Sequence, residues 1–470
     1  MSSETTQAAF AARPLAVAQT WRREVRDTLL LTLPIAGGLL AEMGMGVIDY
    51  SMAGHLGPSA LAAAGLGLQL MFTPMLWGMG AISATGAVGA QAHGAGDAES
   101  VSESMRQGFL MATLLSLPIM AVLVALLPLL PLVELPGVRS DEVLRDVRHI
   151  IYWGLPWVPL TYWYTVLRNF VTVMQRPAIV TICSIAGLPV SFLSNFVFMY
   201  GAWGAPKLGV EAVGLTNSIV ALLHLVMIVA YVEWVPSLRR YRIFARLLRI
   251  DTKMMAELFR VGVPIAMSYL FESGLFFVAT VLMLHISVIA LAAHNVVLNI
   301  CAMSFMIPYA LSQAATVRVG YAIGARQPEA ARRAGYVAIG LGVFWMMMSA
   351  TMMWLVPNLL TSVYLDMADS ANADVIELAA SLFVIAAVFQ VVDGTQVTTQ
   401  GALRGIKDTA VPMLLCGLGY WVFGLGSAAT FAFVLGYGAV GLWWGLAIGL
   451  AVSASLLFLR WRRLSGRLIA

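Results

Sequence analysis

Charged residues are scarce in this chain of 470 residues: Asp, Glu, Lys and Arg make up 11% of it, whereas hydrophobic residues make up 60%. Soluble domains typically contain about 25% charged residues. Together with a mean hydropathy of +0.84, this scarcity excludes a soluble protein and indicates a chain built for lipid. The net charge of +4 comes from basic residues spread over short segments without a recognition module, so we expect no nucleic-acid partner.

Cysteine and the common catalytic motifs are also scarce. Cys183, Cys301 and Cys416 all fall in apolar runs, which excludes a disulfide framework and a thiolate metal cage. The chain lacks a P-loop, an H-E-x-x-H zinc helix and a G-x-S-x-G nucleophile elbow, so we expect neither an enzyme nor a bound cofactor. The glycine pattern of residues 436–441 has no flanking strand-and-helix unit and is interpreted as a tight turn.

What the chain does contain is a series of long apolar runs. About 20 mostly apolar residues cross the hydrocarbon layer as a helix, and helical hydrogen bonding satisfies the backbone there. The sequence therefore predicts an all-α integral membrane protein. Its twelve transmembrane helices are expected at residues 27–52, 59–85, 108–133, 149–170, 178–202, 211–235, 257–285, 289–316, 334–358, 378–400, 411–435 and 439–460.

The two halves of the chain are related by duplication. A shift of 230 positions lays residues 34–99 on residues 264–329 without a gap, and 17 of the 66 pairs are identical, among them Glu42 with Glu272. Later in each half, Leu167-Arg168 corresponds to Leu403-Arg404. Six spans per half give both halves the same orientation, which predicts two six-helix bundles around a pseudo-twofold axis, with a central cavity.

The basic residues predict how the chain is divided and oriented. With both termini in the cytoplasm, 24 of the 28 Lys and Arg fall on the inner side, leaving Arg139, Arg145, Arg148 and Lys207 outside. We therefore expect a multi-pass membrane protein with both termini in the cytoplasm. The expected parts are a cytoplasmic N-terminal tail (1–26), an N-terminal bundle (27–235), a cytoplasmic linker (236–256), a C-terminal bundle (257–460) and a cytoplasmic tail (461–470).

Four carboxylates lie within the predicted spans: Glu42, Asp49, Glu272 and Asp393. An ionisable side chain inside a membrane span is costly and usually marks an ion pathway, so these residues are the main candidates for function. A buried acid can hold a proton, Na⁺ or a cationic drug in turn, and competition between them couples their movements. A structural acid satisfied by a neighbour is the alternative, and it is strongest for Glu42.

The coupling ion could be Na⁺ or H⁺, and aromatic residues of the spans could line the substrate site. Na⁺ would need hard oxygen ligands, which Glu272, Asp393, Thr395 and backbone carbonyls opened at Gly274 and Gly394 can supply, whereas H⁺ needs only the acids. Aromatic faces attract cations and cover flat apolar molecules. The candidate substrate-lining residues are Phe72, Trp77, Tyr162, Phe276, Phe305 and Tyr309.

These motifs together resemble the multidrug and toxic compound extrusion (MATE) family, in particular its NorM-type bacterial branch. The resemblance is carried by residues 44–49 (GMGVID), 91–96 (QAHGAG), 389–394 (FQVVDG) and 401–405 (GALRG). It implies cation coupling by Asp49, Glu272 and Asp393, with Asn195 in the same polar region. It also implies a drug/H⁺ or drug/Na⁺ antiporter that works by alternating access.

Other classes remain open at this point. A flippase for a lipid-linked precursor should show a basic cavity for phosphate, and the spans contain few Lys or Arg. A membrane receptor or a membrane enzyme would signal or turn over without a gradient. For the antiporter we expect a monomer in membrane lipid that acts on lipophilic or cationic small molecules.

Overall fold

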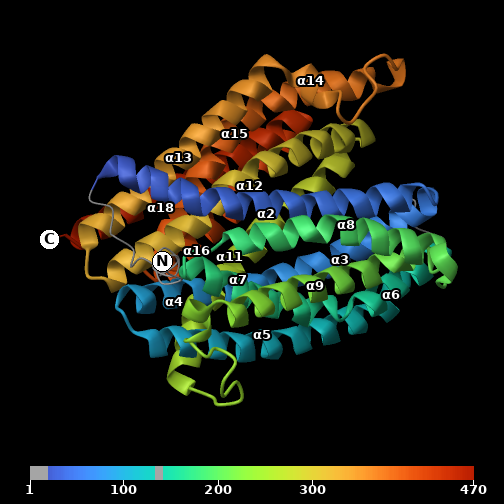
Figure 1. Ribbon diagram of the computed structural model, residues 1–470. Helices are drawn as coiled ribbons and strands as arrows, with labels where there is room; N and C mark the ends of the chain where they lie inside the picture. Colours follow the sequence, from blue (N-terminus) through green and yellow to red (C-terminus); the bar gives the residue numbers. More distant parts are fainter. Residues whose placement is uncertain (1–19, 133–140, 470) are drawn as a thin grey trace, which may run out of the picture. The chain divides into compact units, whose positions relative to one another are not determined.

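The computed structural model describes residues 20–132 and 141–469, and all regular elements within them are helices (Figure 1). Eleven of these helices are long and apolar enough to cross a membrane. The prediction of an all-α integral membrane protein is therefore confirmed. Residues 1–19 of the predicted N-terminal tail, Val133 at the end of the third predicted span, Arg139 and Ala470 lie outside the described residues.

The fourth predicted span, 149–170, is divided between two helices. They are α6 (Asp141–Gly154) and α7 (Trp157–Val173), separated by Leu155 and Pro156. Proline has no backbone N–H and cannot continue the helical hydrogen-bond ladder, which accounts for the interruption. The sequence pattern alone did not reveal this break.

The chain forms two compact units. Unit 1 holds residues 37–93 and 97–266, and unit 2 holds residues 20–36, 94–96 and 267–469. The boundaries after Ala36 and after Ala266 are 230 positions apart, which is the same shift that relates the sequence repeats. Residues 27–36 were expected in the N-terminal bundle and 257–266 in the C-terminal bundle, but each segment groups with the other unit.

Unit 1 is a bundle of helices that run side by side (Figure 1). Helix α9 packs against α6, α7 and α8, while α3 packs against α5 and α6. The helices of this unit are α2 (Trp21–Gly54) from residue 37 onward, α3 (Pro58–Ile82), α4 (Ala84–Gly94), α5 (Ala98–Leu126), α6, α7, α8 (Ala178–Tyr200), α9 (Ala212–Trp234) and α10 (Pro236–Arg239). Short 3₁₀ turns at Leu127–Leu132, Ala202–Gly204 and Gly209–Glu211 connect them.

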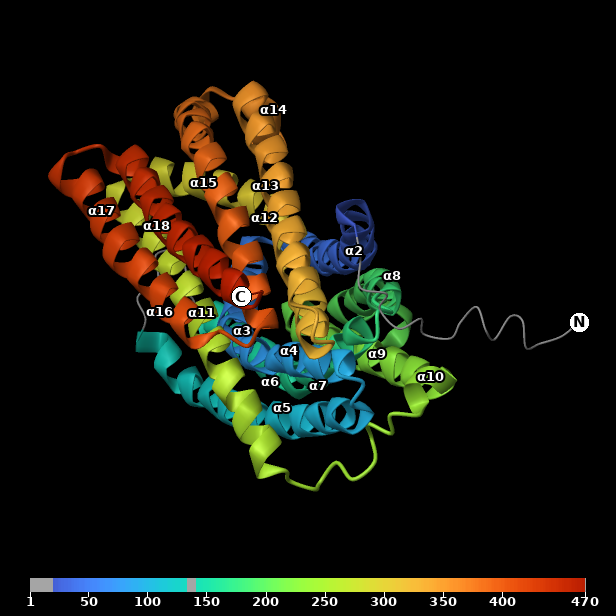
Figure 2. The same ribbon diagram turned by 90° about the vertical axis from the view of Figure 1, so that its left-hand side faces the viewer.

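Unit 2 is built around α15 (Ala373–Gly405), which packs against α12, α13 and α18 (Figure 2). Residues 396–405 of α15 are buried without exception. The other helices are α11 (Thr252–Ile286) from residue 267 onward, α12 (Val288–Gly324), α13 (Pro328–Leu355), α14 (Pro357–Thr361), α16 (Ala410–Gly417), α17 (Gly426–Ala429) and α18 (Gly438–Arg467). A 3₁₀ turn, Ser370–Asn372, precedes α15.

The eleventh predicted span, 411–435, contains two π-helical segments. They cover Leu418–Leu425 and Thr430–Val434, on either side of α17. Wide turns of this kind often occur at functional sites, and the first of them carries the buried Tyr420. The glycine pattern after this span is the tight turn that we predicted, because Gly436 and Gly438 have φ of +74° and +55°.

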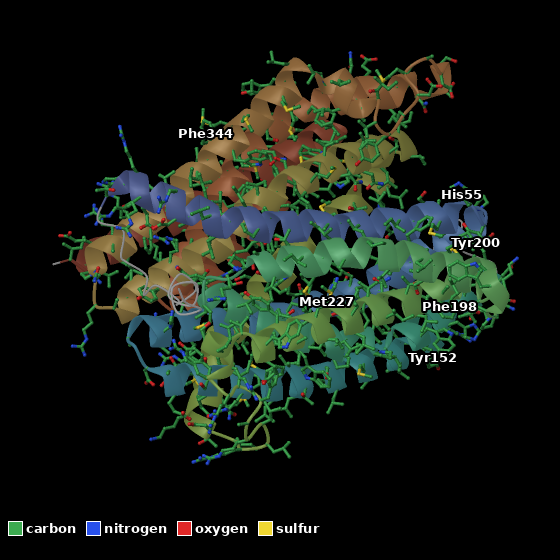
Figure 3. The ribbon with its side chains drawn as sticks, viewed as in Figure 1. His55, Tyr152, Phe198, Tyr200, Met227 and Phe344 are labelled. Carbon is green, nitrogen blue, oxygen red and sulfur yellow. The ribbon has the colours of Figure 1, made fainter. Side chains whose placement is uncertain are left out.

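Aromatic and polar side chains gather at one end of unit 1. Figure 3 shows His55, Tyr152, Phe198 and Tyr200 at that end, and the Tyr200 hydroxyl donates to the carbonyl oxygen of Met52 over 3.0 Å. Tyrosine is common where a membrane protein meets the lipid headgroups. On unit 2, Phe344 of α13 is 68% exposed, as expected for a side chain that faces lipid (Figure 3).

A glycine substitution tests the close packing of unit 2. A Cβ on Gly445 would lie 2.2 Å from the backbone of Ala428, whereas a Cβ on Gly340 would meet nothing within 4 Å. We expect Gly445→Ala to destabilise the protein by about 1–3 kcal/mol, because backbone must move to admit the methyl group. Thermal unfolding of the purified protein measures this change, with Gly340→Ala as control. Equal stability of the two variants would contradict this packing.

Candidate functional site

Asp49 occupies a buried polar site in unit 1. Its carboxylate accepts hydrogen bonds from the Asn195 side chain at 2.6 Å, from the Asn217 side chain at 2.9 Å and from the Ser191 hydroxyl at 3.3 Å. Only 2% of Asp49 is exposed. Helices α2, α8 and α9 supply these groups, and the three donors stabilise an ionised carboxylate that lies away from bulk water.

The same carboxylate lines a cavity of about 290 Å³ within unit 1. The lining combines two acids, one arginine, polar side chains and an apolar, aromatic wall. It comprises Glu42, Met45, Gly46, Asp49, Tyr50, Leu68, Gln69, Phe72, Met75, Met79, Trp157, Thr161, Tyr164, Thr165, Arg168, Ser191, Asn217, Val220, Ala221 and His224. Such a mixture suits an amphipathic or cationic small molecule.

Glu42 and Arg168 form an ion pair in this cavity. The guanidinium of Arg168 lies 3.9 Å from the carboxylate of Glu42, whose side chain is one-third exposed to the cavity. Hydroxyl groups of Tyr164 and Ser184 surround the pair. The ring of His224 lies 5.3 Å from that of Tyr164, and its Nε2 has no hydrogen-bond partner in the described part of the chain.

Unit 2 brings together the other two carboxylates. Glu272 on α11 and Asp393 on α15 are close enough for their charges to interact, and Asp393 is 7% exposed. Neither carboxylate accepts a hydrogen bond or forms an ion pair with another side chain of residues 20–132 and 141–469. Two adjacent acids that lack hydrogen-bond donors are stabilised by positive charge, supplied by a basic neighbour, a proton or another cation.

Arg404 is the basic neighbour of Glu272. Its guanidinium donates to the side-chain oxygen of Gln400 at 2.8 Å and to the Tyr269 hydroxyl at 3.2 Å, and it stacks over the Tyr269 ring at 5.1 Å. The Tyr269 hydroxyl in turn lies 3.3 Å from that of Tyr309. The charge of Arg404 acts on Glu272, although the pair is not in direct contact.

Buried neutral groups complete the surroundings of these acids. Tyr420 and Cys416 lie close enough to Glu272 to interact with its charge, and Cys301 lies equally close to Asp393. Cys183, Cys301 and Cys416 are all free and buried, as the sequence predicted. The described residues contain no group of three or more His, Cys, Asp and Glu side chains that could hold a metal ion.

The structure does not present Thr395 or the backbone carbonyls at Gly274 and Gly394 as the Na⁺ ligands that the sequence suggested. Thr395 donates its hydroxyl to the carbonyl oxygen of Val391 and lies two residues after Asp393, on another face of α15. Helices α11 and α15 run unbroken through Gly274 and Gly394, so no carbonyl is opened there. These glycines instead allow close packing, since added Cβ atoms would lie 3.0 Å from Trp421 and 2.4 Å from Met346.

The six candidate aromatic residues fall into separate environments. Phe72 lines the cavity of unit 1, whereas Trp77 and Tyr162 do not. Tyr162 is fully buried, and its hydroxyl donates to the carbonyl oxygen of Met75 at 3.0 Å, so it holds α7 against α3. In unit 2, Phe276 packs on Phe389, and Phe305 stacks on Tyr309 at 6.0 Å.

Phe72 and Tyr162 should therefore respond differently to substitution. We expect Phe72→Ala to raise the KM for a lipophilic cation several-fold, because a cavity-facing aromatic contributes about 0.5–2 kcal/mol to cation binding. Tyr162→Phe should leave KM unchanged and lower stability by about 1 kcal/mol, since it removes one buried hydrogen bond. Transport kinetics and thermal unfolding of both variants measure these effects. A raised KM in Tyr162→Phe alone would contradict the assignment.

Several polar residues of the two sites were not among the sequence candidates. Asn217 is one of three donors to Asp49, and Arg168 and Arg404 are 8% and 7% exposed. The amide of Asn217 within an apolar span was a usable signal, because unpaired amides are costly in lipid. Trp157, which corresponds to Asp393 in the repeat, lines the unit 1 cavity.

The chain has many membrane-spanning helices and two homologous halves, and each half places two carboxylates and an arginine among apolar spans. These features define a membrane transporter. The sequence model of the MatE family matches residues 34–197 and 264–430. This chain belongs to the MATE family, as its motifs indicated.

Curated relatives cover nearly the whole chain. A probable multidrug resistance protein NorM of Mesorhizobium japonicum is 39% identical over 446 residues, covering 94% of each protein. The multidrug resistance protein NorM of Burkholderia vietnamiensis is 37% identical, covering 97% of this chain and 98% of its own. These relatives confirm the resemblance to the NorM-type branch.

Solved structures confirm the fold. An outward-facing multidrug resistance MATE family transporter of the MOP superfamily has a TM-score of 0.84 at 19% identity, covering 95% of this chain and 96% of its own. A eukaryotic MATE transporter has a TM-score of 0.83 at 19% identity, with 95% and 98% covered.

Proposed function

We propose that this protein is a secondary active antiporter that exports lipophilic, often cationic compounds in exchange for inward H⁺ or Na⁺ by alternating access. It is not an enzyme, since the MATE family consists of transporters. The relatives named NorM are multidrug resistance proteins, and their near-complete coverage of the chain supports the same type of export here.

The observation that carries this proposal is the pair Glu272 and Asp393. Asp393 is buried in unit 2 and Glu272 is half-buried there, their charges interact, and no hydrogen-bond donor of the described chain satisfies them. Two such carboxylates repel each other, and the nearby Arg404 offsets one of their two charges, so the pair still needs a proton or a coupling cation. A drug cation and a coupling cation that compete for one such pair move in opposite directions.

Unit 1 supports the proposal with a second acid. Asp49 lies on the wall of a cavity that also offers Phe72, Trp157 and Tyr164 as aromatic surface. A cation in this cavity would meet a carboxylate held in place by Asn195 and Asn217. Glu42, Asn195 and Thr395 were the predicted auxiliary polar residues, and of these Asn195 contacts an acid of the proposed site.

The proposed orientation has both termini in the cytoplasm of a bacterial cell, with the protein a monomer in the inner membrane. The asymmetry of 24 against 4 basic residues supports it. Phosphate-bearing lipid precursors fit less well, because Arg168 is the only Arg or Lys among the described residues that lines the unit 1 cavity, and that cavity also contains two carboxylates.

Reconstituted protein tests the proposal directly. Dye efflux from proteoliposomes is measured under an H⁺ gradient alone and under a Na⁺ gradient alone, with protein-free vesicles as control. The antiporter is expected to drive uphill dye movement under at least one of the two gradients. Dye movement that ignores both gradients would overturn the proposal.

A further inference from the structure

Both halves of the duplicated chain contain a glutamate and an arginine at corresponding positions. The 230-residue shift places Glu42 on Glu272, and the Leu-Arg pairs place Arg168 on Arg404. In unit 1, Arg168 lies 3.9 Å from Glu42. In unit 2, Arg404 donates to the hydroxyl of Tyr269 at 3.2 Å, and Tyr269 lies three residues before Glu272 on α11, hence on the same side of that helix, so the charge of Arg404 acts on Glu272. In both units, an arginine from the later segment of the repeat therefore lies near a glutamate from the earlier one, as an ion pair in unit 1 and one helical turn away in unit 2.

The second acid of each unit has a different origin. Asp49 corresponds to Ala279 in the repeat, and Asp393 corresponds to Trp157. The aspartates are thus unrelated by the duplication, yet each unit contains one. As a result, the acid site of each unit contains the same charged groups: two carboxylates and one guanidinium.

The arginines cannot leave these sites or lose their charge under ordinary conditions. An arginine side chain keeps its proton in proteins. Arg404 is held by Gln400 and Tyr269, and Arg168 is 8% exposed. A buried fixed cation offsets one carboxylate, so two acids and one arginine leave a single negative charge per unit.

We propose that Arg168 and Arg404 are resident counter-ions, each of which neutralises the glutamate of its unit and limits that unit to one exchangeable cation. Asp49 then holds the exchangeable cation of unit 1, and Asp393 that of unit 2. The proposal rests on the proposed antiport and sets its stoichiometry at two coupling cations per exported molecule.

Within the described residues, no other charged group alters the number of exchangeable cations per unit. The groups that act on Glu42 and Asp49 are Arg168, Ser184, Asn217, Asn195 and Ser191, with Tyr50, Tyr164 and His224 nearby. Those around Glu272 and Asp393 are Arg404, Cys301, Cys416 and Tyr420. The tyrosines and cysteines are neutral, and His224 carries no carboxylate partner.

The test counts coupling cations in proteoliposomes. The substrate is the monovalent cation tetraphenylphosphonium at a fixed gradient, and the driving ion is whichever of H⁺ or Na⁺ drives the wild-type protein. A potassium diffusion potential is varied until net substrate flux stops, and that potential gives the number of cations exchanged. A one-for-one exchange moves no net charge, so a count of one is recognised by a flux that the potential does not change. The wild-type protein should exchange two.

The variants change this number in opposite directions. Arg404→Gln exposes the charge of Glu272 and should raise the count to three, whereas Glu272→Gln should lower it to one. Glu272→Gln with Arg404→Gln removes both charges and should restore two. The same series in unit 1, with Arg168 and Glu42, should give the same counts.

Two further variants separate charge from structure. Arg404→Lys keeps the positive charge but removes the planar set of guanidinium N–H donors. This variant should still exchange two coupling cations. Arg318→Gln removes another buried arginine of unit 2, one that pairs with Glu24, and should also retain two.

A count that stays at two in Arg404→Gln, or a double variant that fails to restore two while Arg404→Lys still folds and transports, would overturn the proposal. Wild-type protein without gradient-driven flux would instead refute the proposed antiport.

Discussion

Asp393→Asn should lower gradient-driven drug efflux at least about tenfold. The substitution keeps the size of the side chain and removes its charge, so the cation that Asp393 holds loses a charge-assisted partner worth about 1.5–3 kcal/mol. A loss of 1.4 kcal/mol corresponds to a factor of ten. Initial rates of dye efflux from proteoliposomes measure the effect.

An aspartate on the same helix provides the control for this substitution. Asp374 lies in the first turn of α15 and is exposed. Asp374→Asn makes the same chemical change away from the buried pair and should leave efflux within about twofold of wild type, as exposed substitutions usually do. Normal efflux in Asp393→Asn would remove Asp393 from the coupling mechanism.

Asp49→Asn is expected to have an effect of similar size through unit 1. The new amide would meet the donors of Asn195 and Asn217, which now face a carboxylate, so one charge and part of the hydrogen bonding are lost together. Efflux should again fall at least about tenfold, since two charge-assisted bonds are weakened. Transport rates at saturating and at low substrate concentration separate an effect on kcat from one on KM.

The exposed Asp141 at the start of α6 supplies the matched control in this unit. Asp141→Asn should transport as the wild type does. If Asp49→Asn transported normally as well, the hydrogen-bonded carboxylate would be a structural feature and not a coupling site.

Much of the fold was predictable because lipid imposes a simple rule on the sequence. Apolar runs of about 20 residues must be helical, so hydropathy placed most spans on observed helices. Several helices extend beyond the predicted ends, as α5 does by starting at Ala98 and α12 by ending at Gly324. The exceptions have local causes: Pro156 divides one predicted span, and π-helical turns run through another. Hydropathy averages over such features and does not detect them.

The four buried carboxylates were also predictable, because a charge inside an apolar run stands out. The arginines were not. Arg168 and Arg404 lie near helix ends, where basic residues normally mark the cytoplasmic side, and they were counted there. Helix α15 continues to Gly405, five residues beyond the predicted end at 400, so Arg404 is buried and acts on Glu272. Only packing between helices reveals that.

Aromatic residues illustrate the same limit. Phe72 and Tyr162 looked equivalent in the sequence, but the side of the helix that each occupies depends on tertiary contacts. The hydroxyl of Tyr162 bonds to a carbonyl of α3, and a Cβ on Gly78 would collide with its ring. Sequence patterns identify aromatic residues within spans and do not identify which of them face a cavity.

The central claim is that drug and coupling cation compete for the same carboxylates, and equilibrium binding tests it most directly. Tetraphenylphosphonium binding to the purified protein is measured over a range of Na⁺ concentrations and of pH. Competition predicts that the apparent Kd rises steadily with the concentration of the coupling cation, while the number of bound drug molecules at saturation stays the same. A Kd that is unaffected by both Na⁺ and pH would contradict the account.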